Sequence, residues 1–263
     1  MRSLRSFFVQ PVKWALARTG RDIVSRDKYG YDPFLDIVRL SETWRYPIDV
    51  YFDVGANDGT TIRHAQNRLG NCRIFAFEPH PQTFSNLKNN FRGVENVELV
   101  NLAVGSEIAT KTMFEYDMSV LNSLLPNAQF AVRFDKKARE IKVDCTTLDN
   151  FCSDRDIHQI DVLKIDTEGF DFEVLKGARS MLSRRAIKFV YFEFNDISPR
   201  GDASGGALEP IDKFIRPLGY RFIASYNDYV LPEGELFLVS NALYAMPPTA
   251  LTQVRGGFKT PGA

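Results

Sequence analysis

The sequence has few of the features that mark several common protein classes. Its three Cys and three His in 263 residues follow no metal-binding spacing. Its 33 Lys and Arg balance its 33 Asp and Glu, so no net positive charge favours a nucleic-acid surface. No window approaches the roughly 20 apolar residues of a membrane span, and no P-loop or Ser/His/Asp series occurs. With the odd cysteine count and no signal peptide, we expect a cytoplasmic protein without disulfides.

The N-terminal segment is the part of the chain that departs from this even charge balance. Residues 1–21 carry five basic and no acidic side chains among aromatic and aliphatic ones, and Pro11 and Lys13 interrupt the apolar run that a cleavable signal needs. One interpretation is a basic amphipathic segment that contacts anionic lipid or a glycan-assembly protein at the periphery of the membrane. The other, which we favour, is a helix that packs its aromatic residues on the domain. We expect a basic helical extension over residues 1–47, a main domain over 48–246 and a disordered tail over 247–263.

Strand and helix patterns alternate through the middle of the chain, and this predicts a doubly wound α/β fold with a parallel sheet. The expected strands are 50–54, 73–78, 97–101, 110–116, 141–145, 161–166, 188–194, 220–226 and 236–240, and the expected helices are 61–69, 81–91, 171–183 and 208–217. Residues 147–151 are expected to form a turn, and the strand over 110–116 belongs to an inserted excursion that runs to residue 125. The glycine-rich segment 197–206 is expected to be a flexible loop that covers a substrate.

Two of the predicted strands end in residues typical of a nucleoside site. The strand over 50–54 leads into Gly55 and Gly59, where missing side chains allow the backbone to approach a ligand and turn into a helix. A Val side chain at Gly55 is expected to block the ligand while leaving the fold intact. Glu78 ends the next strand, 25 residues after Asp53, where an acidic side chain accepts hydrogen bonds from a ribose diol.

The same loop distinguishes between cofactors. Asn57 stands where a dinucleotide fingerprint has its second glycine, and Asp58 would repel a pyrophosphate. A cofactor with a cationic sulfonium and no phosphate fits the acidic loop around Asp53 better, so we expect S-adenosylmethionine. For the loop alone, an ordinary strand-to-helix turn is the alternative, and the second acidic strand end argues against it.

Further carboxylates follow two later strands. Asp166 and Glu168 end one strand and Glu193 ends the next. Because the carboxyl ends of parallel strands meet in one crevice, we expect these three residues near the cofactor as catalytic candidates. One carboxylate could act as a general base on an acceptor hydroxyl, or two could hold a divalent metal. In the structural alternative, Glu168 caps a helix and Glu193 pairs with Lys164 or Arg184.

Several of these segments together resemble the FkbM family of S-adenosylmethionine-dependent methyltransferases. The resemblance covers about residues 48–240 and is carried by segments 53–59, 77–79, 101–105, 147–149, 163–169 and 174–178. The most specific part is the K-I-D-x-E-G sequence from Lys164 to Gly169, followed by L-K-G-A. It implies a Rossmann-like sheet of seven strands and methyl transfer to a hydroxyl of a sugar, polyketide or related metabolite.

By this resemblance, Gly55, Asn57 and Gly59 line the methionine end of the cofactor, Glu78 binds the ribose, and Ala103 and Val104 line the adenine. We therefore expect an O-methyltransferase whose acceptor is a small molecule or glycan, with no assigned metal ligand and no nucleic-acid partner. One alternative is a metal-dependent enzyme similar to catechol O-methyltransferases, with Asp166, Glu193 and Asn195 as ligands. The other is a non-catalytic binding module that keeps the cofactor fold.

Overall fold

The computed structural model describes residues 28–116, 119, 122–125, 138–199, 206–231 and 237–248. The basic segment 1–21 and all but the first two residues of the predicted tail lie outside these ranges, as do residues 200–205 of the predicted loop. Predictions about those segments therefore stay predictions.

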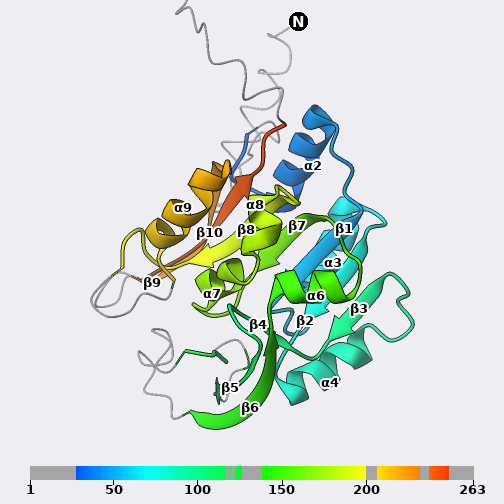
Figure 1. Ribbon diagram of the computed structural model, residues 1–263, viewed down its shortest axis with the longest axis vertical. Coiled ribbons are helices and arrows are strands. Elements are labelled where there is room, and N and C mark those ends of the chain that lie inside the picture. The colour runs from blue at the N-terminus through cyan, green and yellow to red at the C-terminus, as the bar shows by residue number, and fades with distance from the viewer. Residues whose placement is uncertain are drawn as a thin grey trace, which may run out of the picture.

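A seven-stranded sheet forms the centre of the fold, in the order β3-β2-β1-β7-β8-β10-β9 (Figure 1). Its strands are β1 (Val50–Val54), β2 (Arg73–Phe77), β3 (Val97–Val100), β7 (Ile160–Ile165), β8 (Ile187–Phe194), β9 (Arg221–Leu231) and β10 (Phe237–Ala245). The first five in spatial order run parallel, and β10 pairs antiparallel with both β8 and β9. The predicted seven-stranded, doubly wound α/β fold is confirmed.

Helices cover both faces of this sheet, because its central strands are apolar on both sides. The helices are α2 (Pro33–Trp44), α3 (Thr60–Leu69), α4 (Pro81–Asn90), α6 (Leu148–Asp154), α7 (Asp171–Lys176), α8 (Arg179–Ser183) and α9 (Leu208–Ile215), followed by the short η2 (Arg216–Leu218). Side chains alternate along each strand: Phe52 packs into the core beneath α6 to α9, and Tyr51 packs into the core beneath α2 to α4. The sheet is therefore the middle of three layers.

Part of the predicted N-terminal extension packs against the sheet. In α2, Phe34, Ile37 and Leu40 are buried in the same core as Tyr51. The helix begins at Asp32, whose carboxylate accepts hydrogen bonds from the backbone N–H groups of residues 34 and 35. No helix in the described ranges is long and apolar enough to cross a membrane.

A second sheet of three strands is inserted between β3 and β7. It consists of β4 (Ala103–Val104), β5 (Ala109–Glu115) and β6 (Arg139–Thr146), in the order β4-β6-β5. In Figure 1 it lies beyond the carboxyl ends of β1 and β2, below the central sheet. The inserted excursion expected from the sequence thus stands next to the strand ends that carry the candidate site.

Two sequence-based expectations about helices are wrong. The single helix expected over 171–183 is two helices, α7 and α8, that break at Gly177. A Cβ at this glycine would lie 1.9 Å from the Gly105 carbonyl oxygen, so the chain is in direct backbone contact there. The turn expected over 147–151 is the start of α6, because Thr147 accepts a hydrogen bond from Asn150 N–H and caps a helix.

Candidate functional site

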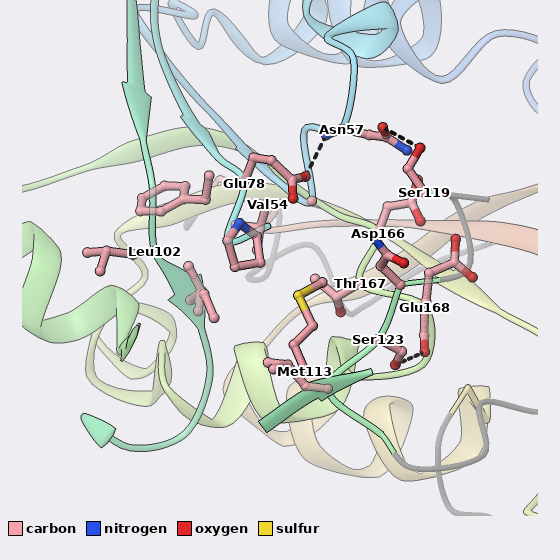
Figure 2. A pocket seen from close by; sticks show the side chains of 17 residues that line it. Val54, Asn57, Glu78, Leu102, Met113, Ser119, Ser123, Asp166, Thr167 and Glu168 are labelled. Carbon is pink, nitrogen blue, oxygen red and sulfur yellow. Dashed lines mark hydrogen bonds between the residues drawn. The ribbon is translucent and has the colours of Figure 1, made fainter. Parts of the chain in front are cut away.

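An open cavity of about 700 Å³ lies where the carboxyl ends of β1, β2 and β7 meet the inserted sheet. Figure 2 shows Glu78 and Val54 on one side of the cavity, Asp166, Thr167 and Glu168 on another, and Met113 facing them from the inserted sheet. Of the predicted cofactor residues, Gly55, Asn57, Glu78, Ala103 and Val104 line the cavity.

The loop after β1 is held in a conformation that requires glycine. Gly55 has φ +83°, and a Cβ there would lie 1.8 Å from the backbone oxygen of Asp166. The glycine therefore lets the first loop rest directly on the end of β7. Gly59 serves a different purpose, since its Cβ would lie 2.1 Å from the Phe91 ring. It does not line the cavity but permits close packing of α3 on α4.

Glu78 joins the end of β2 to this loop. Its Oε2 accepts a hydrogen bond from Asn57 N–H at 3.0 Å, and its Oε1 accepts one from His80 N–H at 2.9 Å. Burial raises the pKa of the Glu78 carboxyl to about 7, against the lowering effect of these two bonds. Each carboxylate oxygen has further acceptor capacity, so the group can also bind the hydroxyls of a ribose that reaches it.

The opposite side of the cavity is apolar. Pro79, Leu102, Ala103 and Val104 form it from the chain around β4, and Met113 and Leu124 complete it from the inserted excursion. An apolar lining of this kind suits a flat heteroaromatic ring such as adenine. The sequence pointed to Ala103 and Val104, but it gave no reason to select Met113 or Leu124.

The excursion is fastened to both loops of the site. Ser119 donates a hydrogen bond to Asn57 Oδ1 at 3.3 Å, and Ser123 donates one to the backbone oxygen of Glu168 at 2.9 Å (Figure 2). Between them, Asn122 is 9% exposed and accepts a hydrogen bond from Tyr116 N–H at 2.8 Å through its amide oxygen. Because a backbone N–H only donates, the contact leaves the Asn122 amide nitrogen as a donor at the cavity.

These residues of the excursion were not identified from the sequence. The only available signal was the polar pair Asn122 and Ser123 inside an apolar stretch, which many surface turns share. A second connection ties the inserted sheet to β2, because His80 Nε2 lies 2.9 Å from Glu115 Oε1 and Glu115 also pairs with Arg139. His80 accepts a hydrogen bond from Thr83 N–H through Nδ1, so its Nε2 is available to donate to Glu115.

The acidic strand ends do come together. Carboxylate oxygens of Asp166, Glu168 and Glu193 lie within 4.8 Å of one another. Burial, followed by the charge of Asp166, raises the pKa values of both Glu168 and Glu193 well above their ordinary range. Burial and Asp166 also raise the pKa of the neighbouring Asp171 to about 6. A cluster of carboxyl groups with raised pKa values can take up a proton near neutral pH or bind a divalent cation through its oxygens.

Asp171 supports this cluster from below. It is 1% exposed, and its Oδ2 accepts hydrogen bonds from the hydroxyl of Thr167 at 2.9 Å and from Thr167 N–H at 3.3 Å. Its Oδ1 lies 3.3 Å from Glu193 N–H, so one buried side chain holds the ends of both β7 and β8. The aspartate is at the first position of α7, where the helix dipole favours a negative charge.

Lys164 is the buried cation beneath the site. Its ammonium lies 2.9 Å from Asp53 Oδ1, 3.5 Å from Asp166 Oδ2 and 3.0 Å from the carbonyl oxygen of Gly55. Asp53 is fully buried and does not line the cavity, so the structure puts it under the cofactor loop. Lys164 forms ion pairs with Asp53 and Asp166, whereas the structural alternative considered from the sequence paired Glu193 with Lys164 or Arg184.

Comparison of the sequence with protein families gives one match that covers most of this fold. A family described as the methyltransferase FkbM domain matches residues 53–222. This range begins at Asp53, contains the inserted sheet and ends in β9. It includes every residue of the cavity.

Individual proteins show more distant similarity. The chain is 26% identical to "2-O-methyltransferase NoeI" of Sinorhizobium fredii over 163 residues, which cover 57% of this chain and 65% of that protein. It is 30% identical to "Hexuronic acid methyltransferase AglP" of Haloferax volcanii over 165 residues, which cover 61% and 62% of the two proteins. The matches thus span less than two thirds of either relative.

Among solved structures, the chain is similar to a precorrin-6y C5,15-methyltransferase from Geobacter metallireducens, at 17% identity and a TM-score of 0.42. The superposition covers 81% of this chain and 87% of that one.

Proposed function

The chain belongs to the FkbM methyltransferase family, and we propose that it transfers the methyl group of S-adenosylmethionine to a hydroxyl of a saccharide or related metabolite. The observation that carries the proposal is that Glu78, the loop at Gly55 and the acidic pair Asp166 and Glu168 face one cavity from three strand ends. The names of the two relatives, one a 2-O-methyltransferase and one acting on hexuronic acid, support a sugar hydroxyl as acceptor.

The cavity residues fit three parts of this cofactor: the adenine, the ribose and the sulfonium. The apolar surfaces at Leu102 and Met113 suit the adenine, and the Glu78 carboxylate suits the ribose diol. At the other end, the carboxylates of Asp166 and Glu168 suit a cationic sulfonium. When bound, the cofactor supplies an electrophilic methyl group.

The reaction requires little of the protein beyond alignment and proton removal. An acceptor oxygen must lie in line with the methyl group and its leaving sulfur, and binding both molecules in one cavity provides that alignment. The acceptor hydroxyl must also lose its proton. Asp166 is the candidate to accept it, because it lines the cavity and its side chain is 37% exposed.

The spacing of the carboxylates favours one second candidate, a metal-dependent O-methyltransferase. Asp166, Glu168 and Glu193 offer oxygens within 4.8 Å of one another, a geometry in which Mg²⁺ or Ca²⁺ could be held. A bound divalent ion would lower the pKa of the acceptor hydroxyl and replace the general base. In this candidate Glu168 joins the two acids that the sequence suggested as ligands.

A radiolabel transfer assay tests the function and separates the two candidates. The protein is incubated with S-adenosyl-L-[methyl-³H]methionine and a panel of glycans and free sugars, with and without EDTA. We expect labelled glycan in both arms if a carboxylate is the base, and label only in the EDTA-free arm if a metal is required. Binding of S-adenosylmethionine without label in any acceptor would favour a binding module, and absence of binding would overturn the proposed function.

The pKa of Glu78 predicts how cofactor affinity depends on pH. The ionised carboxylate accepts hydrogen bonds from both ribose hydroxyls, and the protonated form accepts fewer. With a pKa of about 7 in the free protein, the ionised fraction rises about tenfold between pH 6 and pH 8. We expect the affinity for S-adenosylmethionine, measured by calorimetry, to rise by about the same factor.

The control for this prediction is Glu78→Gln, which keeps the shape and cannot titrate. Its affinity should be weaker at pH 8 and nearly constant between pH 6 and pH 8. The free energy of unfolding changes with pH in the opposite direction to the cofactor affinity. Because folding raises the pKa of this carboxyl, the protein loses stability as pH rises from about 4.5 to about 7. A wild-type affinity that does not change over this range would remove Glu78 from the ribose site.

A further inference from the structure

We propose that Lys164 is a positioning residue that fixes the cofactor loop after β1 against the acidic end of β7. The proposal rests on the proposed function, because it assigns the lysine a role in cofactor affinity. It goes beyond the neutralisation of a buried carboxylate, which the ion pair with Asp53 alone would explain.

The three partners of the Lys164 ammonium come from three parts of the site. Asp53 belongs to β1, Gly55 to the loop that follows it, and Asp166 to the end of β7. The ammonium donates a hydrogen bond to the Gly55 carbonyl oxygen, and its contacts with the carboxylates of Asp53 and Asp166 are ion pairs. The side chain is 3% exposed, and these contacts therefore form in a setting where they are strong and costly to lose.

Strand register explains how the lysine reaches all three. Asp53 and Lys164 are direct partners in the parallel pair of β1 and β7, so their side chains leave the sheet on the same face. The loop beyond Asp53 then passes over the ammonium, and Gly55 packs on the Asp166 backbone without room for a Cβ. Lys164 thus lies directly beneath the point where the two loops touch.

The charge of Lys164 persists in this setting. Burial by itself lowers the pKa of the lysine, but the carboxylates of Asp53 and Asp166 outweigh burial and raise the pKa above its ordinary value. The ammonium is therefore fully protonated at neutral pH and keeps all of its donors. Its donor to the Gly55 carbonyl acts on the loop backbone and has no part in neutralising Asp53.

A second lysine, which is largely but not fully buried, provides a comparison. Lys188 lies 2.8 Å from Asp161, which is also fully buried, and its side chain is 12% exposed. This pair joins β8 to the beginning of β7, at the end of the sheet opposite the cavity, and Lys188 also contacts the Pro47 carbonyl at 3.3 Å and the Tyr46 ring at 5.0 Å. Both pairs join a lysine to a fully buried aspartate, but Asp161 also accepts hydrogen bonds from Asp49 N–H, Val50 N–H and the Gln159 side chain. Of the two pairs, the one at Lys164 contacts the cofactor loop.

The experiment replaces each pair by neutral residues, since removing a lysine alone would leave a buried unpaired carboxylate. We compare two double variants, one with Lys164→Met and Asp53→Asn and the other with Lys188→Met and Asp161→Asn. For each we measure the melting temperature and the affinity for S-adenosylmethionine and S-adenosylhomocysteine by calorimetric titration. Both double variants should melt at lower temperature. We expect the first to bind both ligands about tenfold more weakly or worse, as one lost hydrogen bond to a charged donor implies, and the second to keep wild-type affinity within about twofold.

A third double variant, Lys164→Gln with Asp53→Asn, keeps a donor for the Gly55 carbonyl without the charge. Partial recovery of affinity relative to the methionine variant is expected. Wild-type affinity in the methionine variant would overturn the proposal and leave Lys164 as the counter-ion of Asp53. If both Lys164 double variants fail to fold while the Lys188 double variant folds, the proposal is also overturned, because the lysine would then serve the fold itself. A wild-type protein that binds neither ligand would instead refute the proposed function.

Discussion

Replacing Gly55 by alanine should abolish S-adenosylmethionine binding and lower the melting temperature by several degrees. The new Cβ would lie 1.8 Å from the Asp166 backbone oxygen, and no side-chain movement can relieve a contact between two backbones. The positive φ of +83° adds strain for any residue with a side chain. Strain and overpacking of this kind cost about 2–4 kcal/mol, a large fraction of the stability of an ordinary domain.

The matched control is Gly93→Ala. Gly93 has a similar φ of +78°, but nothing lies within 4 Å of its Cβ position, so the variant carries the conformational strain without the clash. Circular dichroism and calorimetry on both variants separate the two effects. If the affinity of Gly55→Ala for S-adenosylmethionine is within a few-fold of that of Gly93→Ala, then the loop at Gly55 is not the cofactor loop.

This outcome differs from what the sequence predicts for the same position. From the sequence, a side chain at Gly55 obstructs a ligand and spares the fold, because only the local turn is visible. The structure adds the neighbour that the sequence does not reveal, namely the Asp166 backbone more than a hundred residues away. The same limitation explains Gly177, where contact with the Gly105 carbonyl breaks a helix that the apolar periodicity predicts as continuous.

The parts of the fold that the sequence predicts well are those with local causes. Apolar strands such as β1 and β7 are recognisable by their residues, and alternation with helices implies parallel pairing. The convergence of Asp166, Glu168 and Glu193 follows from the same rule, because parallel strands end at one edge.

Residues whose role depends on register or on an inserted segment were not predicted. Lys164 reaches Gly55 only because it stands opposite Asp53 across two strands. Asn122 and Met113 reach the cavity only because the inserted sheet folds back over the ends of β1 and β2. Neither arrangement has a periodicity or motif in the sequence, and both require the three-dimensional fold.

Asp166→Asn should lower the turnover number for methyl transfer by about 100-fold or more, and it should weaken S-adenosylmethionine binding by a much smaller factor, because it removes one of the two carboxylates that suit the sulfonium. Asparagine keeps the shape and one oxygen that can accept a hydrogen bond, but it cannot take up the proton of the substrate hydroxyl. A positioned base contributes about 100-fold to the rate. Asp166 is suited to this role because it lines the cavity and its side chain is 37% exposed, so an acceptor hydroxyl can reach the carboxylate.

The stability of the variant provides an internal check on this assignment. The charge of Asp166 helps to raise the pKa values of Glu168, Asp171 and Glu193, so ionising these acids costs stability as pH rises. Removing that charge relieves the cost and offsets the lost ion pair with Lys164, which is long at 3.5 Å. The melting temperature at pH 8 should therefore equal or slightly exceed that of the wild type.

Asp144→Asn, an exposed substitution on β6 away from the cavity, is the control and should turn over normally. The kinetic assay uses the acceptor found in the radiolabel screen, in the presence and absence of EDTA. Loss of turnover that added Mg²⁺ restores would identify Asp166 as a metal ligand. Normal turnover by Asp166→Asn in both conditions would show that the acidic cluster is structural and that alignment of the two substrates suffices for the reaction.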